Sequence, residues 1–345
     1  MVFLFCFGTT ACLAQEISSR DKRPGPGAQT LTLSVNGLER SYIVQVPTRY
    51  DSRAPLPVVV MLHGGGGTAK GAMRETGWAQ KADREGFLAV FPNALARDPM
   101  RPSSFSRNPQ LWNDGSDRFY PDQKVVDDVS FINALLDDLS ARFPVDARRV
   151  FVTGFSNGAS MSFRVGAELS HRIAAIAPVA GALWLDPVAL ELPVPMLYIT
   201  GTDDPLNLIE GGVPKLATGA SDKIRAKPKP PVRDSIVKWA KALGCSPASV
   251  SKSRENGIGK ETYCPGHIDV EVVYITVDGL GHTWAGGKSL LPERMVGKTS
   301  DKIKATDVIW DFFRIHARVV ADDVAQDAPA GTDKILRPRT TPAGD

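Results

Sequence analysis

The sequence has few of the residues that build metal centres and nucleic-acid surfaces. It contains four cysteines and five histidines in 345 residues, and none of them cluster with the ligand spacing of a zinc site. The net charge of +3 is small, and no dense basic block carries interleaved aromatic residues, so we expect no nucleic-acid partner. No apolar run reaches the length of a transmembrane helix, so we also expect no membrane span.

The first apolar stretch has the character of an export signal. Residues 1–14 are apolar and end in small residues, which is typical of a secretory signal peptide, although the usual basic opening is missing. We therefore expect a secreted or periplasmic protein, with a linker over residues 15–29 and a disordered tail over residues 317–345. The alternatives are a disordered or buried apolar N-terminus and a lipid-modified Cys12, although the residues before Cys12 form a poor lipobox.

Two cysteines lie outside the expected signal. Because Cys245 and Cys264 form an even pair in a chain that we expect to be exported, the sequence predicts a disulfide between them. In the chain-entropy description, such a bond would stabilise the fold by about 3 kcal/mol. The alternative is two unpaired buried thiols.

Strand-like and helix-like segments alternate through the middle of the chain. The Asn36-Gly37 pair between two alternating segments is a strong hairpin signal, and continuous apolar runs indicate strands that are buried on both faces. We expect strands over residues 30–35, 40–46, 57–62, 87–91, 149–153, 173–179, 195–200 and 270–277, and helices over residues 71–85, 125–143, 159–170, 232–243 and 303–316. This order predicts one α/β domain over residues 30–316, with a mostly parallel central sheet and helices on both faces. Residues 98–120 lack periodicity and predict a long, functional surface loop.

The segment Gly154-Phe155-Ser156-Asn157-Gly158 joins an apolar strand to a helix. A strand, a G-x-S-x-G sequence and a helix are the context of a nucleophile elbow, in which the serine sits on a strained turn. Glycines two residues before and after the serine allow neighbouring segments to approach closely. The Asn157 N–H lies at a helix N-terminus, where unpaired donors favour negative charge. Ser156 is therefore the predicted nucleophile of a hydrolase.

A serine nucleophile needs a base and an acid that orients the base. Among the histidines, His282 lies in a glycine-rich loop after the last strong strand, which is where a base is expected in this chain order. The acid should lie at a strand end between Ser156 and His282. Asp204 is favoured over Asp203, because its spacing from Gly201 sets it past the turn, and Asp186 is a weaker candidate.

Four glycines follow an early strand, at residues 64–67. They allow the backbone to pass close to a substrate with its amides turned inward, so this loop and Asn157 would supply the donors that stabilise a tetrahedral oxyanion. The rival interpretation, a phosphate-binding loop, lacks both the G-x-x-x-x-G-K-[ST] and the dinucleotide-binding patterns.

With these motifs the chain resembles the extracellular polyhydroxybutyrate depolymerase and feruloyl esterase group of α/β-hydrolases. The resemblance covers roughly residues 30–316, and Ala285 stands where the final loop of that group usually has proline. It depends on residues 62–69, 112–113, 126–132, 154–161, 201–205 and 281–287.

The resemblance implies the α/β-hydrolase fold, secretion, no metal or cofactor, and hydrolysis of carboxylic esters. It implies Ser156, Asp204 and His282 as the triad, and the amides of Gly65 and Asn157 as the oxyanion hole. The expected substrate is a hydroxyalkanoate polyester oligomer or a feruloyl or acetyl ester of a plant polysaccharide, and a monomer is expected. A prolyl-oligopeptidase-like peptidase and a non-catalytic binding protein on a hydrolase fold are the alternatives.

Two aromatic and two acidic residues near these motifs have ambiguous roles. Trp112 and Trp284 could line the substrate pocket, or they could be ordinary core packing. Asp127 and Asp128 open the expected helix before the elbow, where acids are favoured for structural reasons.

Overall fold

A computed structural model describes residues 25–117, 126–214 and 227–318. The predicted signal peptide, Cys12 and almost all of the predicted tail lie outside the described residues. None of the described helices is both long and apolar enough to cross a membrane.

A ten-stranded sheet runs through the molecule in the order β1-β2-β4-β3-β5-β6-β7-β10-β9-β8. Neighbouring strands from β4 to β10 in this order are parallel, while β1, β2, β9 and β8 pair antiparallel at the two edges. The strands are β1 (Gly27–Val35), β2 (Leu38–Val46), β3 (Leu56–Leu62), β4 (Leu88–Pro92), β5 (Val145–Phe155), β6 (Ala175–Val179), β7 (Met196–Gly201), β8 (Val250–Glu255), β9 (Ile258–Tyr263) and β10 (Val272–Val277).

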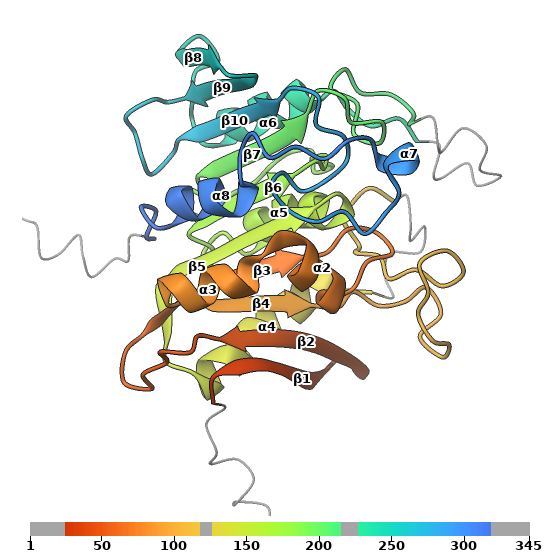
Figure 1. The fold of residues 1–345 in the computed structure, drawn as a ribbon. Coiled ribbons are helices and arrows are strands. Elements are labelled where there is room, and N and C mark those ends of the chain that lie inside the picture. Colours follow the sequence, from red (N-terminus) through yellow and green to blue (C-terminus); the bar gives the residue numbers. More distant parts are fainter. Residues whose placement is uncertain (1–24, 118–125, 215–226, 319–345) are drawn as a thin grey trace, which may run out of the picture.

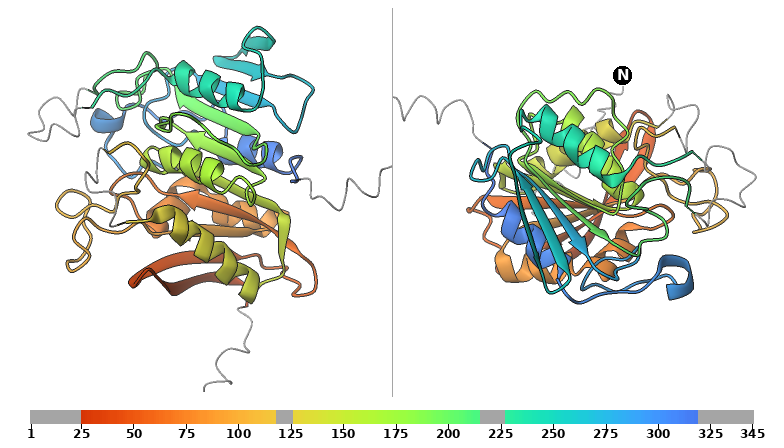
Figure 2. Two further views of the ribbon diagram at one scale, coloured as in Figure 1. Left: turned by 180° about the vertical axis from the view of Figure 1, so that it is seen from behind. Right: turned by 90° about the horizontal axis from the view of Figure 1, so that it is seen from above.

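Helices cover both faces of this sheet. In Figure 1, α2, α3 and α8 lie in front, and the reverse view in Figure 2 brings α4, α5 and α6 forward. The helices are α2 (Ala69–Thr76), α3 (Trp78–Glu85), α4 (Asp128–Arg142), α5 (Asn157–Glu168), α6 (Val232–Ala242), α7 (Glu293–Val296) and α8 (Ala305–Phe313). The predicted α/β architecture, mostly parallel with helices on both faces, is confirmed.

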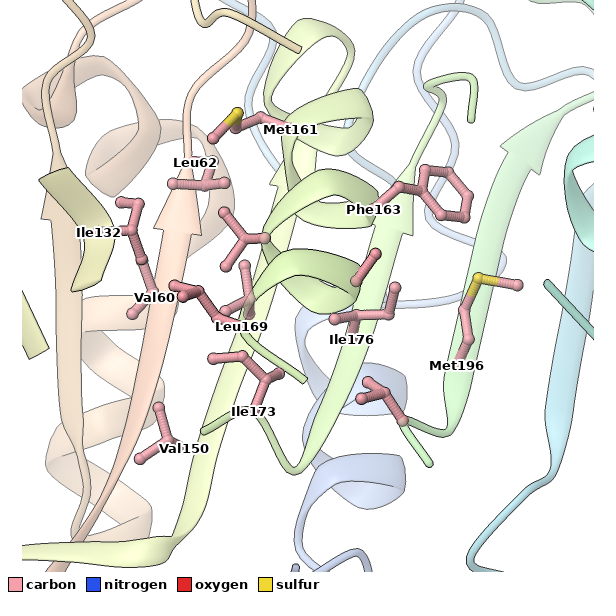
Figure 3. Packing of buried hydrophobic residues seen from close by; sticks show 14 of the residues in the cluster. Val60, Leu62, Ile132, Val150, Met161, Phe163, Leu169, Ile173, Ile176 and Met196 are labelled. Carbon is pink, nitrogen blue, oxygen red and sulfur yellow. The ribbon is translucent and has the colours of Figure 1, made fainter. Parts of the chain in front are cut away.

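The alternation of side chains along β3 divides the core in two. Val58, Val60 and Leu62 pack toward α4, α5 and α6, whereas Val59 and Met61 pack toward α2, α3 and α8. Figure 3 shows the first of these two layers from close by. Every residue of β3 is buried, which explains why its sequence is a continuous apolar run.

Three segments differ from the expectations. β1 begins at Gly27, so the last residues of the predicted linker belong to the sheet. The expected helix over residues 71–85 is two helices, because Gly77 adopts a left-handed conformation with φ 71° and ends α2. The hairpin of β8 and β9 lies outside the expected strands, although its Asn256-Gly257 turn carries the same signal as Asn36-Gly37.

The predicted disulfide is present between Cys245 and Cys264. It links the residues after α6 to the end of β9. Tyr263, beside Cys264, pairs with Val272 at the start of β10. The bond therefore lies at the amino end of β10, whereas the loop that carries His282 follows its carboxyl end.

Candidate active site

Ser156 occupies the sharp turn between β5 and α5. Its backbone has φ 56° and ψ −116°, a region that costs free energy for a residue with a side chain. Hydrogen bonds hold the turn in place, since Ser156 N–H donates to Val179 O at 2.9 Å and its carbonyl accepts from Ser160 N–H at 3.0 Å. The Ser156 hydroxyl does not cap α5, and among the described residues it makes no hydrogen bond.

The glycines around Ser156 are required by close backbone contacts. A Cβ atom on Gly154 would overlap the carbonyl of Gly158, and a Cβ atom on Gly158 would overlap the carbonyls of Leu62 and His63. The end of β3 therefore touches the start of α5 directly. This approach explains physically why the G-x-S-x-G sequence accompanies the turn.

His282 and Asp204 meet at the carboxyl edge of the sheet. His282 Nδ1 lies 2.8 Å from Asp204 Oδ2, and both side chains are buried. The other Asp204 oxygen accepts the backbone N–H groups of Leu206 and Asn207 at 2.8 and 2.7 Å. These bonds hold the carboxylate toward the ring.

The environment keeps the Asp204 carboxyl ionised. Burial raises its pKa, but the charge of His282, the hydrogen bond to His282 and the two backbone N–H groups outweigh burial and lower the pKa below its usual value. A carboxylate in this state can orient the imidazole and stabilise its cation.

The other two candidate acids do not contact His282. Asp203 accepts a hydrogen bond from the hydroxyl of its neighbour Thr202 and faces solvent. Asp186 is exposed and pairs with Lys238 at 3.5 Å.

The His282 ring lies next to the elbow. It packs against Phe155, the residue before Ser156, with 4.8 Å between the ring centroids. The backbone of the His282 loop is bound to a neighbouring segment, since Gly281 N–H donates to Lys298 O at 2.8 Å and His282 N–H donates to Val296 O. The imidazole thus sits on a fixed backbone.

Gly65 and Asn157 lie side by side at a cavity. An ideal Cβ on Gly65 would lie 3.6 Å from Asn157 Cβ. The next two backbone amides of the glycine loop already donate hydrogen bonds within the protein. Gly66 N–H donates to Gln110 O, and Gly67 N–H donates to Gly64 O. Asn157 opens α5, where a backbone N–H has no partner within the helix.

This cavity has a volume of about 390 Å³, and Ser156 lies on its wall. Gly65 and Asn157 form one side of it. The long loop after β4 forms another side through Phe105, Leu111 and Asp114, so the part of residues 98–120 that the structure describes does border the site.

Neither of the two tryptophans considered as pocket residues lines this cavity. Trp112 is fully buried in the core, and its indole N–H donates to His63 O at 2.9 Å. Trp284 donates to Thr306 Oγ1 at 3.0 Å and lines a separate cavity of about 30 Å³ together with His282. Both positions fit packing around the site better than contact with a substrate at Ser156.

His63 supports the glycine loop from the core. Its Nε2 accepts from Ala94 N–H at 3.1 Å, so Nδ1 carries the proton toward Gly64 O at 2.8 Å. Burial lowers the pKa of His63 to about 4, which keeps the ring neutral near pH 7. The ring serves as a structural donor and acceptor.

Asp127 and Asp128, the two acids before the elbow, both have structural partners. Asp127 caps α4 by accepting from Ser130 N–H. Asp128 pairs with buried Arg40 at 2.6 Å and accepts from Asn113 N–H at 2.7 Å.

Sequence reasoning missed the side chain of Asn157. Its amide accepts from Trp112 N–H at 2.7 Å and donates to Trp112 O at 3.1 Å and to Asp114 Oδ2 at 2.8 Å. Its position directly after the serine indicated only a role for its backbone N–H.

The described residues contain no group of three or more His, Cys, Asp or Glu side chains arranged to hold a metal ion.

The chain is similar in sequence to known hydrolases. The profile of the dienelactone hydrolase family matches residues 44–217, half of the chain. NocK of Nocardia uniformis subsp. tsuyamanensis, named as an esterase, is 28% identical over 318 residues, which cover 88% of each chain. Feruloyl esterase B of Piromyces equi is 27% identical over 254 residues, 72% of this chain but only 44% of that protein.

A solved structure supports the fold. The acetyl xylan esterase from Aspergillus awamori superposes with a TM-score of 0.51 over 74% of this chain and 94% of its own, at 16% sequence identity. This likeness concerns the architecture alone.

Proposed function

The chain belongs to the dienelactone hydrolase family and is a carboxylic ester hydrolase, and we propose that it works through an acyl-enzyme on Ser156. The observation that carries the proposal is the strained Ser156 turn on a cavity wall, with the buried His282–Asp204 pair packed against the adjacent Phe155. A strained serine, a histidine and a buried carboxylate in this chain order form the machinery of serine hydrolases.

In the first half of the reaction, His282 Nε2 accepts the Ser156 proton as Oγ attacks the ester carbonyl. Asp204 holds Nδ1–H and stabilises the imidazolium that forms. The imidazolium then protonates the leaving alcohol. Because the Ser156 hydroxyl makes no hydrogen bond in the described structure, we expect its bond to His282 to form when substrate binds.

The tetrahedral intermediate carries a negative charge that needs fixed donors. We assign this role to the N–H groups of Gly65 and Asn157, two residues that line the same cavity as Ser156. One such donor typically contributes about 10²–10³ in rate. In the second half of the reaction, His282 activates a water molecule that releases the acid from Ser156.

The substrate class follows from the relatives and the resemblance. A feruloyl or acetyl ester of plant polysaccharide agrees with the feruloyl esterase among the relatives. A hydroxyalkanoate polyester or its oligomers remains the second candidate. The disulfide is compatible with an exported enzyme, and we propose a secreted or periplasmic monomer whose catalytic domain spans residues 30–316.

An activity panel on the purified protein tests this proposal. Methyl ferulate, acetylated xylan, hydroxybutyrate oligomers and p-nitrophenyl butyrate are compared for wild type and Ser156→Ala. We expect the variant to lose hydrolysis of every ester by a factor of about 10⁴ or more while its melting temperature stays within a few degrees. Ser140→Ala, at an exposed position of α4, is the control. Retained turnover by Ser156→Ala would disprove the mechanism.

A further inference from the structure

A buried carboxylate lies on the wall of the cavity that contains Ser156. Asp114 is 3% exposed and borders the cavity with Ser156 and Asn157. Its two oxygens are held from different sides, because Oδ2 accepts from Asn157 Nδ2 at 2.8 Å and Oδ1 accepts from Ser116 N–H at 3.1 Å. An ionised carboxylate has about four acceptor sites and no donor.

The segment that carries Asp114 is rigidly attached to the elbow. Trp112 exchanges two hydrogen bonds with the Asn157 side chain, and Asn113 N–H donates to Asp128. Asp128 in turn forms the buried pair with Arg40. The position of the Asp114 carboxylate is therefore fixed relative to Ser156 before any substrate binds, and preorganisation of this kind reduces the entropy lost on binding.

The cavity has an apolar side and a polar side. Phe105, Pro109 and Leu111 supply the apolar side. The polar groups include Asp114, Ser160 and Lys229. The Ser160 hydroxyl accepts from Ala182 N–H at 3.0 Å, and Lys229 Nζ lies 3.4 Å from Asn207 Oδ1. A ligand with a hydroxyl group can add hydrogen bonds on the polar side, whereas a plain alkyl chain cannot.

We propose that Asp114 is a specificity-determining residue that accepts a hydrogen bond from a hydroxyl group of the ester substrate. This inference rests on the proposed esterase function of Ser156. The hydroxyl can belong to the acyl part, as in a hydroxy acid, or to the alcohol part, as in a polyol or sugar. In either case the ligand group is a hydrogen-bond donor, which is what an acceptor-only carboxylate requires.

Matched pairs of esters separate the two sources of the hydroxyl. p-Nitrophenyl 3-hydroxybutyrate is compared with p-nitrophenyl butyrate for the acyl part, and 2-hydroxyethyl butyrate with ethyl butyrate for the alcohol part. The enzymes are wild type, Asp114→Ala and Asp114→Asn. Asp98→Asn is the control, because Asp98 is a half-exposed carboxylate on the same loop that does not line the cavity.

The expected result is a preference of wild type for the hydroxylated ester of one pair by about tenfold to hundredfold in kcat/KM, the range of a hydrogen bond to a charged group. Asp114→Ala should lose that preference, so that its kcat/KM values for the two members of the pair become similar. The control should keep the wild-type ratio.

Two results would overturn the inference. One is a wild-type enzyme without preference in either pair, and the other is an Asp114 variant that loses both members of a pair equally while its melting temperature is unchanged. Failure of the proposed function would look different, because wild type would then hydrolyse none of the four esters or would do so without Ser156.

Discussion

At the scale of single residues, local contacts decide which of several similar side chains can act. Asp203 and Asp204 are neighbours in one turn, yet only Asp204 turns inward to His282 and receives two backbone N–H groups. His63 and His282 each follow a strand and have glycines close by in the sequence. His63 is enclosed in the core, whereas His282 lies beside the elbow.

The two aspartates provide the first prediction at this scale. Asp204→Asn should lower kcat for p-nitrophenyl butyrate by about 10⁴, because an amide cannot stabilise the His282 cation and favours the wrong tautomer. Asp203→Asn should change kcat less than about threefold. Steady-state kinetics of both variants check this, and equal losses would contradict the assignment of Asp204.

His63 provides a prediction about pH. Its pKa is about 4 in the folded protein and about 6.5 in an unfolded chain, so the unfolded state binds more protons between these values. The free energy of unfolding should therefore fall as the pH is lowered from 6.5 to 4, by up to about 3 kcal/mol from this residue. Urea unfolding of wild type and His63→Gln at several pH values measures the difference in slope.

The surface residue His171 is the matched control for that experiment. His171→Gln controls for the replacement of an imidazole by an amide at a surface position. Asp204 acts in the same direction but at lower pH, because its pKa is depressed below the usual value of about 3.9. The stability that it contributes is present above that value and is lost as the pH falls further. For the His63 experiment, an equal dependence of the unfolding free energy on pH in His63→Gln and wild type would contradict a buried, neutral His63 ring.

At the scale of elements, the turn between β5 and α5 is predictable because its sequence is dictated by sterics. A Cβ atom on Gly158 would meet the end of β3 and a Cβ atom on Gly154 would meet the carbonyl of Gly158, so this turn requires glycine at both positions. The walls of the cavity are not predictable in this way. Asp114 and Phe105 lie on a loop whose path depends on contacts with Asn157 and Gly66, which are distant in sequence.

Glycine replacement tests the elbow as an element. Gly158→Ala would force a Cβ atom into the carbonyls of Leu62 and His63, so we expect it to destabilise the fold by about 3 kcal/mol and to abolish activity. Gly25→Ala is the control, since no atom lies within 4 Å of the position that its Cβ would occupy. Chemical unfolding and p-nitrophenyl butyrate turnover measure both effects, and a stable, active Gly158→Ala would contradict the close contact.

Some features of the secondary structure follow from neighbouring residues in the sequence, whereas others depend on tertiary contacts. The Asn36-Gly37 hairpin follows from the turn residues alone. The break between α2 and α3 depends on Gly77 in a left-handed conformation, and a glycine within a helical pattern does not by itself reveal whether the helix continues. The packing of Trp112 in the core depends on tertiary contacts, which a sequence pattern does not contain.

At the scale of the whole molecule, the parallel strands bring the candidate catalytic loops together at one edge of the sheet. β3, β5, β7 and β10 run in the same direction, so the glycine loop, the elbow, the acid turn and the His282 loop all follow carboxyl ends of parallel strands. The alternation of strands and helices is enough to predict this arrangement. The antiparallel hairpin that extends the sheet at β8 is harder to predict, because most residues of β8 are exposed and form no apolar run.

The disulfide tests the stability of the whole fold separately from catalysis. Replacing both Cys245 and Cys264 with alanine should cost about 3 kcal/mol and lower the melting temperature by about 5 °C. kcat/KM at 25 °C should stay near wild type, because the bond lies at the amino end of β10. Calorimetry and kinetics on the double variant measure both, and loss of activity without a change in melting temperature would contradict this separation.

The proposed chemistry requires a covalent intermediate on Ser156. Reaction of the intact protein with a fluorophosphonate, followed by proteolysis and mass spectrometry of the labelled peptide, shows which serine reacts. We expect a single adduct on Ser156, with labelling slowed at least about a hundredfold in His282→Ala. An adduct on another serine, such as Ser160, or no adduct on the active wild-type enzyme would contradict it.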